Sequence, residues 1–280
     1  YEDYIGIYQK AIEDYSMAID LNPDNSRYYF DRAWVYGFSL EKKEFNKAIQ
    51  DFTRANDLDP DSANMNNIGT MLRDNTQQYN RAIYYYDLSI QMDSLSYYGY
   101  RNKGVTYVKM GDYDKAFENF NKAIELDSTV VYNYELRAEA YEDVGELDKA
   151  VDDYSNAIKF TEDEYKYEYY YRRGGVLLDF IDDENISKGI DDLKKSFQSY
   201  PFQGTLNNIA VGYRRINELD SALVYYDKAI ALDSSSYLPY RNKAEIYRNQ
   251  KKYNLAEDAY TKAIENITKL NSSNDEIAYS

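Results

Sequence analysis

The chain of 280 residues contains no cysteine and no histidine. The absence of cysteine excludes disulfides and thiolate nucleophiles, and the absence of histidine excludes imidazole bases. Ordinary zinc sites are built from these same residue types, so they are excluded as well. Carboxylate pairs and Ser–Lys or Tyr–Lys arrangements remain as catalytic options, and none has a recognisable setting in this sequence. We therefore expect a protein that is not an enzyme and has no cofactor.

One stretch is similar to the start of a calcium-binding loop, because Asp57, Asp59 and Asp61 alternate along the chain. Such a loop needs glycine at its sixth position and glutamate at its twelfth. Ser62 and Ile68 stand at those positions instead. The sequence therefore predicts no metal site.

Basic residues are few relative to acidic ones: 33 Lys and Arg stand against 49 Asp and Glu, which gives a net charge of −16. Nucleic acids and anionic membranes are negatively charged, so neither is expected to be the main partner. Apolar runs are short, and none approaches the ~20 residues that a membrane-spanning helix needs. We expect a soluble protein without membrane insertion, whose partner is a basic or amphiphilic protein or peptide.

No signal peptide is recognisable, and the chain starts at Tyr1 in the middle of a repeated motif. We expect an N-terminal piece, such as a targeting segment, to precede this residue. The localisation is therefore left open between the cytoplasm and export with the targeting segment removed.

The most informative feature of the chain is a recurring motif, exemplified by residues 113–128, YDKAFENFNKAIELDS. Its small anchor residue recurs at Ala11, Ala48, Ala82, Ala116, Ala150, Gly189, Ala222 and Ala256. The successive spacings are 37, 34, 34, 34, 39, 33 and 34 residues. A period near 34 is typical of helix-turn-helix solenoids, which bury their core between neighbouring units. We predict one all-α solenoid over residues 1–268, with a tail or the start of a capping helix over residues 269–280.

One unit, residues 97–128, indicates why each repeat forms a helical pair. Tyr100, Gly104 and Tyr107 follow a three-to-four residue rhythm, which is the period of an amphipathic helix. Gly111 and Asp112 interrupt the rhythm before it resumes. Glycine can adopt positive φ where the first helix ends, and aspartate can accept hydrogen bonds from the free amides of the second. We therefore expect two helices joined by a short turn.

Small residues mark the places where paired helices approach closely. We expect Gly104, Ala116 and Ala123 to be spacers, because larger side chains would collide with the facing helix. Two spacings exceed the others, and they contain the polar segments 37–44 and 182–187. We expect both segments to form extended turns between helices.

Over nearly the whole chain, this pattern resembles the tetratricopeptide repeat family. The resemblance implies a right-handed superhelical solenoid of antiparallel helix pairs, with about seven full repeats after a leading half repeat whose helix covers residues 8–20. It also implies that the first helices line a concave groove, which typically holds a peptide segment of a partner protein. The leading interpretation is a non-enzymatic protein interaction scaffold.

In this family, groove-facing positions lie one, five, eight and nine residues after the first packing aromatic residue of a repeat. The resemblance makes these residues the partner-binding candidates: Trp34, Arg101, Glu135, Glu139, Asn207, Arg214, Arg241 and Arg248. Acidic groups gather at Glu135 and Glu139, and basic groups gather in the last two repeats. The two glutamates are compensated either by Arg101 and Lys109 or by a basic segment of the partner.

The 35 tyrosines leave other interpretations open. Nineteen of them occupy four recurring packing slots, so most are expected in the core. The surplus, which includes Tyr84, Tyr85, Tyr98 and Tyr171, is suited to stacking on sugar rings, and a carbohydrate-binding protein is the alternative. A further alternative is a structural module that assembles with its own copies through the solenoid ends, although a monomer is favoured.

Because a solenoid is stabilised by contacts between neighbouring units, we predict that a chain cut after Asp127 leaves an N-terminal fragment that is still helical. Far-ultraviolet circular dichroism of the fragment measures this. A fragment without helical signal would contradict the solenoid architecture.

Overall fold

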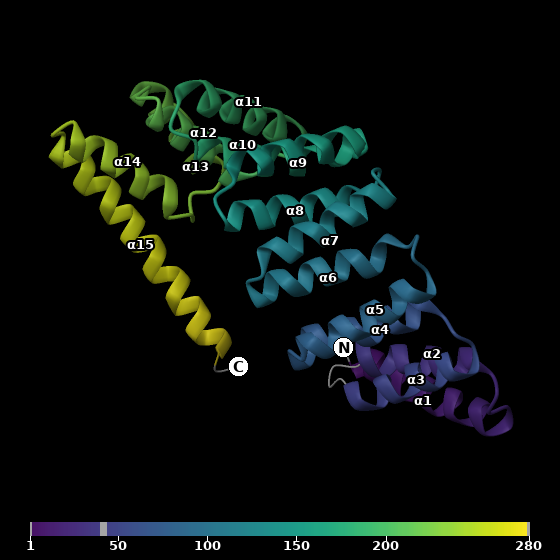
Figure 1. The fold of residues 1–280 in the computed structure, drawn as a ribbon. Helices are drawn as coiled ribbons and strands as arrows, with labels where there is room; N and C mark the ends of the chain where they lie inside the picture. The colour runs from purple at the N-terminus through teal and green to yellow at the C-terminus, as the bar shows by residue number, and fades with distance from the viewer. Residues whose placement is uncertain (1, 40–43, 279–280) are drawn as a thin grey trace. The chain divides into compact units, whose positions relative to one another are not determined.

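The computed structural model describes residues 2–39 and 44–278, and within these ranges it contains helices and no strands. Side chains are described for residues 6–37 and 44–269. The chain divides into two compact units, unit 1 over Tyr1–Ala140 and unit 2 over Tyr141–Ser280. Figure 1 follows the helices of both units along the chain. Within the described ranges, no helix has the length and apolar character required to cross a membrane.

Unit 1 consists of helices of which α1 to α7 each pack against the next one in the chain. The elements are α1 (Glu2–Leu21), α2 (Ser26–Trp34), η1 (Val35–Ser39), α3 (Phe45–Leu58), α4 (Ser62–Thr76), α5 (Tyr79–Met92), α6 (Tyr97–Met110), α7 (Tyr113–Leu126) and α8 (Val131–Asp143). The division between the units falls inside α8.

Unit 2 repeats this arrangement, and α9 to α15 again pack in sequence. Its elements are α9 (Leu147–Phe160), η2 (Asp163–Tyr165), α10 (Lys166–Leu178), α11 (Asp183–Ser199), α12 (Gln203–Arg215), α13 (Leu219–Leu232), α14 (Leu238–Asn249) and α15 (Tyr253–Ala278). The predicted all-α class and the pairing of helices are confirmed. Residues 269–278 continue the backbone of α15, and the predicted extent of the solenoid as one domain stays a prediction.

The turns inside the helix pairs follow the predicted chemistry. Gly111 ends α6 with φ of 77°, and the Asp112 carboxylate accepts a hydrogen bond from the backbone amide of Lys115 at 3.3 Å. Gly145 has the same φ between α8 and α9. Three non-glycine residues also reach positive φ in equivalent turns: Gln77, Asn217 and Lys251. Glycine is therefore the least strained choice for this turn, although other residues can form it.

The spacer residues separate the two helices of a pair from each other's aromatic side chains. A side-chain carbon placed on Gly104 would lie 2.6 Å from the ring of Phe120, and one on Gly69 would lie 2.5 Å from the ring of Tyr86. Such distances are far below van der Waals contact, so neither glycine tolerates a larger residue without movement of the ring. Ala123 is completely buried as well. The spacer prediction is confirmed.

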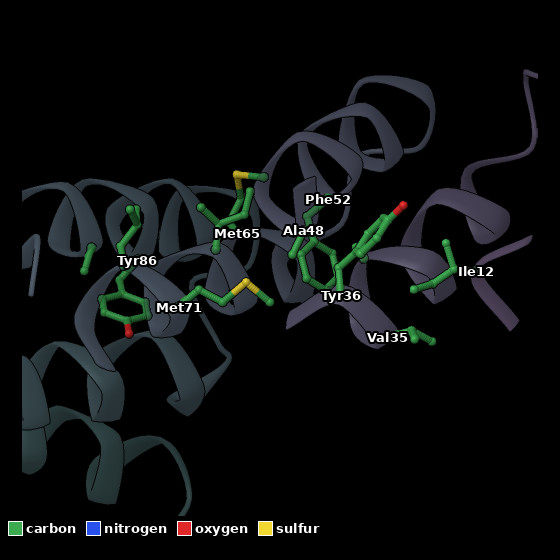
Figure 2. Packing of buried hydrophobic residues seen from close by; sticks show 12 residues of the cluster. Ile12, Val35, Tyr36, Ala48, Phe52, Met65, Met71 and Tyr86 are labelled. Atoms are coloured by element: carbon green, nitrogen blue, oxygen red, sulfur yellow. The ribbon is translucent and has the colours of Figure 1, made fainter. Parts of the chain in front are cut away.

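A continuous hydrophobic core joins α1 to α5 in unit 1, and Figure 2 shows its packing. Phe52, Met71 and Tyr86 are fully enclosed in this core. The equivalents of Tyr86 in unit 2 are Tyr154 and Tyr226, with exposed fractions of 1% and 0%. Most tyrosines of the predicted packing slots are at least half-buried.

Tyr253 departs from this pattern, because it is 64% exposed although it occupies a predicted packing slot. The other members of its slot pack partly against neighbouring helices. Within the described part of the chain, no helix follows α15 to cover Tyr253. A tyrosine at a recurring position of the motif is therefore buried only where a following helix packs against it.

The prediction of an extended turn over residues 37–44 is wrong for residues 37–39. Gly37 lies in η1, a π-helical segment that continues α2. A side-chain carbon on Gly37 would overlap the Met71 side chain, so this segment packs tightly against α4. Residues 40–43 lie outside the described residues.

The prediction of an extended turn over residues 182–187 is also wrong. The helix predicted over residues 8–20 is present but longer than predicted. Asp182 caps α11 by accepting a hydrogen bond from the backbone amide of Asn185 at 2.8 Å, and residues 183–187 form the first turns of this helix. The helix is lengthened to 17 residues, which absorbs the insertion. The leading helix α1 likewise has 20 residues and begins at Glu2.

The two units also carry matching polar contacts, which reveal a longer internal repeat. In unit 1, Arg32 Nε lies 2.7 Å from the Asp51 carboxylate, and in unit 2 Arg173 Nε lies 2.7 Å from that of Asp192. Each residue of the second pair stands 141 positions after its counterpart. The Nη1 of each arginine, which does not contact the aspartate, donates to a serine hydroxyl of the preceding repeat. The distance is 2.9 Å to Ser16 in unit 1 and 2.8 Å to Ser155 in unit 2. Equivalent residues of the two units can therefore be compared directly.

We predict that Ala123→Leu and Ala150→Leu each lower the free energy of unfolding by about 1 to 3 kcal/mol, because both alanines are fully buried between paired helices. Denaturant midpoints measure the change. Glu118→Leu, at an exposed position of α7, is the matched control and should change stability little. Midpoints equal to wild type in both alanine variants would refute the spacer assignment.

Candidate functional site

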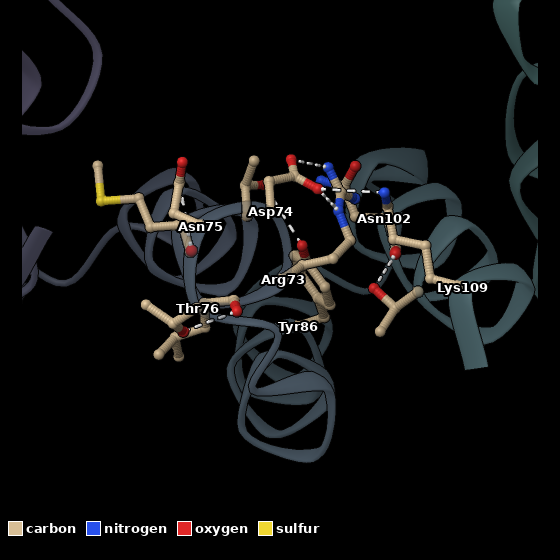
Figure 3. A network of polar contacts seen from close by, with 11 residues as sticks. Arg73, Asp74, Asn75, Thr76, Tyr86, Asn102 and Lys109 are labelled. Carbon is tan, nitrogen blue, oxygen red and sulfur yellow. Dashed lines mark hydrogen bonds and ion pairs between the residues drawn. The ribbon is translucent and has the colours of Figure 1, made fainter. Parts of the chain in front are cut away.

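A network of polar side chains links the first helices of two successive repeats in unit 1, α4 and α6 (Figure 3). Arg73 of α4 donates to Asp74 through Nε and Nη2, each at 2.7 Å. Lys109 of α6 holds its Nζ 3.9 Å from the Asp74 carboxylate. The remaining Arg73 nitrogen, Nη1, is buried without a hydrogen-bond partner among the described residues. Arg73 is only 9% exposed, so this unsatisfied donor belongs to a nearly enclosed cation.

Both members of this pair are charged. Burial is the largest influence and opposes the charge on Arg73, but the hydrogen bond to Asp74 and the Coulombic attraction of Asp74 and nearby tyrosines together outweigh it and raise the pKa of Arg73. Burial also opposes the charge on Asp74, and the same hydrogen bond, helped by Lys109, still lowers the pKa of Asp74 below its ordinary value. One carboxylate therefore serves two cations, which leaves the cluster with a net positive charge.

Arg101 of α6 lies among three tyrosine rings in place of a counter-ion. Its guanidinium carbon is 5.5 Å from the ring centroid of Tyr97, 4.9 Å from that of Tyr98 and 5.2 Å from that of Tyr132. Burial lowers the pKa of Arg101. Attraction by aromatic faces offsets part of the lost hydration. No carboxylate of the described residues forms an ion pair with Arg101.

Asparagines fix the spacing of α4 and α6. Asn102 Nδ2 donates to Asn66 Oδ1 at 3.3 Å, and Asn66 Nδ2 donates to the Ser89 hydroxyl at 2.7 Å. The Ser89 hydroxyl in turn donates to the backbone carbonyl of Ser62 at 2.9 Å. Asn66 is buried, so these bonds hold the two helices in register and orient the neighbouring Arg101.

Unit 2 contains the same set of residue types in the same order. The sets are Asn66, Arg73, Arg101 and Asn102 in unit 1, and Asn207, Arg214, Arg241 and Asn242 in unit 2. Asn242 Nδ2 donates to Asn207 Oδ1 at 3.1 Å, which reproduces the asparagine contact of unit 1. Arg214 differs from Arg73 because it pairs with Glu245 of α14, at 2.7 Å. Arg241 is exposed and forms no ion pair among the described residues.

The predicted binding residues occupy different environments. Trp34 is 44% exposed, and its ring stacks on Phe30 at 6.4 Å. Glu135 and Glu139 are half-buried on α8, and Arg248 is exposed on α14. Asn207 is 7% exposed, so its amide mainly holds Asn242 in place.

The structure decides one question about the two glutamates. Arg101 and Lys109 were the expected partners of Glu135 and Glu139, but Arg101 lies among tyrosine rings and Lys109 reaches towards Asp74. Ion pairs of these two cations with the glutamates are therefore not formed, and that explanation of the acidic pair is wrong.

Arg73, Asn66 and Asn102 were not among the predicted site residues. The signal for Arg73 was present, since it follows the spacer Gly69 by four residues as Arg214 follows Ala210. Gly69 precedes the anchor Ala82 by 13 residues, whereas Ala210 precedes the anchor Ala222 by 12, so the common register was not recognised. The rings around Arg101 come from α6 and α8, and no spacing within one motif indicates their convergence.

Family profiles agree with the geometry. Tetratricopeptide repeat profiles match residues 97–130, 203–232 and 240–267. Together with the helix pairs, these matches identify tetratricopeptide repeats in both units of the chain. No curated protein matches the chain by sequence.

Several solved structures share the fold. The C-terminal part of a TPR repeat-containing protein from Cytophaga hutchinsonii is 19% identical, with a TM-score of 0.67 over 81% of this chain and 91% of that chain. YrrB is 20% identical, with a TM-score of 0.57 over 69% of this chain and 97% of its own. MamA is 20% identical, with a TM-score of 0.52 over 60% of this chain and 96% of its own. These likenesses support the solenoid fold.

Burial of the phenol, together with the hydrogen bond that the Tyr97 hydroxyl donates to Tyr98, raises the pKa of Tyr97 to about 12. The folded state thus favours neutral Tyr97, and this contribution to stability is complete below the ordinary tyrosine pKa of about 10. It is lost as the pH rises through the folded value. We predict that tyrosinate absorbance titrations of wild type and Tyr97→Phe differ by one late-ionising tyrosine. A difference centred on the ordinary value would contradict burial of the ring.

Proposed function

We propose that the protein is a non-enzymatic interaction scaffold that binds a segment of a partner protein on the face formed by its first helices. Arg101 carries this proposal, since it is a partly buried cation with aromatic neighbours and no counter-ion among the described residues. In this role, Arg101 and Arg73 bind a carboxylate of the partner segment.

The physical reason is the energy of a desolvated charge. A buried cation without a counter-ion is unfavourable, and an incoming carboxylate restores the lost interactions. Nη1 of Arg73 supplies a further donor that the described residues leave unsatisfied. The asparagine contacts and the packed helices hold these groups before the partner arrives, so little ordering is required on binding.

The recurrence in unit 2 supports the same role there. Arg241 corresponds to Arg101 and is exposed without an ion pair among the described residues, and Arg248 adds a second exposed cation on α14. Both stand out in a chain with a net charge of −16. We assign Arg241 and Arg248 to an acidic part of the partner, and Glu135 and Glu139 to its basic part.

Comparison with a protein of the same fold is consistent with this proposal. YrrB is described as a TPR protein with an unusual peptide-binding site. The aromatic rings near Arg101 fit a sugar site less well. The rings of Tyr97 and Tyr98 stack on each other at 4.3 Å and also face the guanidinium, so their faces are already in contact.

We predict that an acetylated glutamate-rich peptide binds the full chain, and that Arg101→Gln weakens this binding about ten- to a hundredfold. Hydrogen bonds to charged groups contribute about 1.5 to 3 kcal/mol, and about 1.4 kcal/mol corresponds to a factor of ten. Calorimetry at two salt concentrations measures the effect, and the wild-type affinity should fall as salt rises.

Arg81→Gln is the matched control, because Arg81 is an exposed arginine on α5, the second helix of its pair. It should leave the affinity unchanged. Equal affinities of wild type and Arg101→Gln at both salt concentrations would remove the arginine site from the proposal. A lysine-rich peptide that binds more tightly than the glutamate-rich one would count against it too.

A further inference from the structure

A second candidate site lies in unit 2, where α10, the end of α11 and the turn to α12 enclose a cavity of about 340 Å³. Tyr167 and Tyr171 of α10 and Tyr200 and Phe202 of the turn line this cavity. Tyr200 is 55% exposed and Phe202 is 52% exposed. The carboxylate of Glu168 also lines the cavity.

Unit 1 contains a cavity at the equivalent place, between α2, α3 and α4. Its residues stand 141 positions earlier: Arg27 corresponds to Glu168, Phe30 to Tyr171, Asp59 to Tyr200, Asp61 to Phe202 and Ala63 to Gly204. Pro60 and Pro201 occupy the middle of the two turns. Unit 1 therefore builds the same turn with two aspartates, so the fold does not require Tyr200 and Phe202 to be aromatic.

The aromatic residue at the start of α12 replaces a helix cap. In unit 1, the Asp61 carboxylate caps α4 by accepting a hydrogen bond from the backbone amide of Ala63 at 2.9 Å. Phe202 stands at the same position of α12 and offers no side-chain cap. A residue that forgoes a favourable cap and exposes a ring to water works against local stability.

Neighbouring side chains hold the rings in place. The Tyr200 ring stacks on Tyr167 with centroids 4.9 Å apart. A side-chain carbon on Gly204 would lie 2.5 Å from the Phe202 ring, so the absence of a side chain there accommodates this ring. Asn208 Nδ2 donates to the Tyr171 hydroxyl at 3.2 Å.

Glu168 is the one charged residue among the described residues that line the cavity. Glu168 is exposed, and its only ion pair among the described residues is with Arg172, at 3.4 Å. Glu162 and Glu164, in the segment directly before α10, are also exposed. Aromatic faces and carboxylates both attract cations, so they offset part of the hydration that an amine or guanidinium loses on entering the cavity.

We propose that this cavity binds a lysine or arginine side chain of a partner protein. Its volume lies at the lower end of the range for ligand sites and fits one long side chain. A sugar ring fits less well, because the facing surfaces of Tyr167 and Tyr200 are stacked on each other. The site has the opposite charge preference to Arg101 and is separate from the proposed carboxylate site, so each can fail without the other.

Nuclear magnetic resonance titration of the full chain tests the proposal with small probes. N-acetyl-arginine amide and N-acetyl-lysine amide should shift the backbone amides of Gly204 and Thr205 in a saturable manner. N-acetyl-norleucine amide, which has no charge, and maltose should produce at least tenfold weaker binding. Equal binding of the neutral amide or of maltose would overturn the assignment of a cation site, as would the absence of any saturable shift.

Phe202→Asn separates binding from stability. Asparagine caps helices well and is uncharged, so the variant should bind the arginine probe at least tenfold more weakly while its thermal midpoint stays equal or rises. Glu168→Gln should also weaken binding, because it removes the charge and keeps the shape. Tyr84→Ala removes an exposed ring of α5 outside the cavity and is the control. Unchanged binding of the arginine probe by Phe202→Asn would overturn the proposal.

Discussion

The close contact between a small residue and an aromatic ring inside each helix pair is the constraint on which the other features depend. At Gly104 and Phe120 the contact leaves no space for even one additional carbon atom. This distance determines how near α6 lies to α7, and the equivalent contact of Gly69 with Tyr86 determines how near α4 lies to α5. Between the pairs, Asn102 of α6 reaches Asn66 of α4 at 3.3 Å. Arg101 stands beside Asn102 on α6, so its position among the tyrosine rings follows from the same packing.

The fold was largely predictable because its determinants are local. The period of the motif locates each pair, Gly111 and Asp112 mark a turn by known backbone chemistry, and the spacers follow from close packing. The insertions were predicted less well. The extra residues form a π-helical segment at Gly37 and lengthen α11. The spacing between two motif anchors gives the number of extra residues but does not show which helix or turn contains them.

The candidate site was predicted only in part, for a physical reason. Arg101 and Arg241 were found because they occupy a defined position of the repeat. Three rings from two helices surround Arg101, and no carboxylate of the described residues pairs with it. Both features depend on tertiary geometry. The exposed rings of Tyr200 and Phe202 became interpretable only when equivalent turns of the two units were compared. In the sequence of a single repeat, Tyr200 and Phe202 cannot be distinguished from ordinary variation between repeats.

The packing of each helix against the next has a consequence for how the chain folds. Contacts within a unit join helices that are adjacent or next but one along the chain, as in the contact of α4 with α6 and of α10 with α12. No long loop has to close before these contacts form, and chains of this kind fold rapidly. The core that joins α1 to α5 uses residues of unit 1 alone. During synthesis from the N-terminus, this core can therefore form before the residues of unit 2 have been added to the chain.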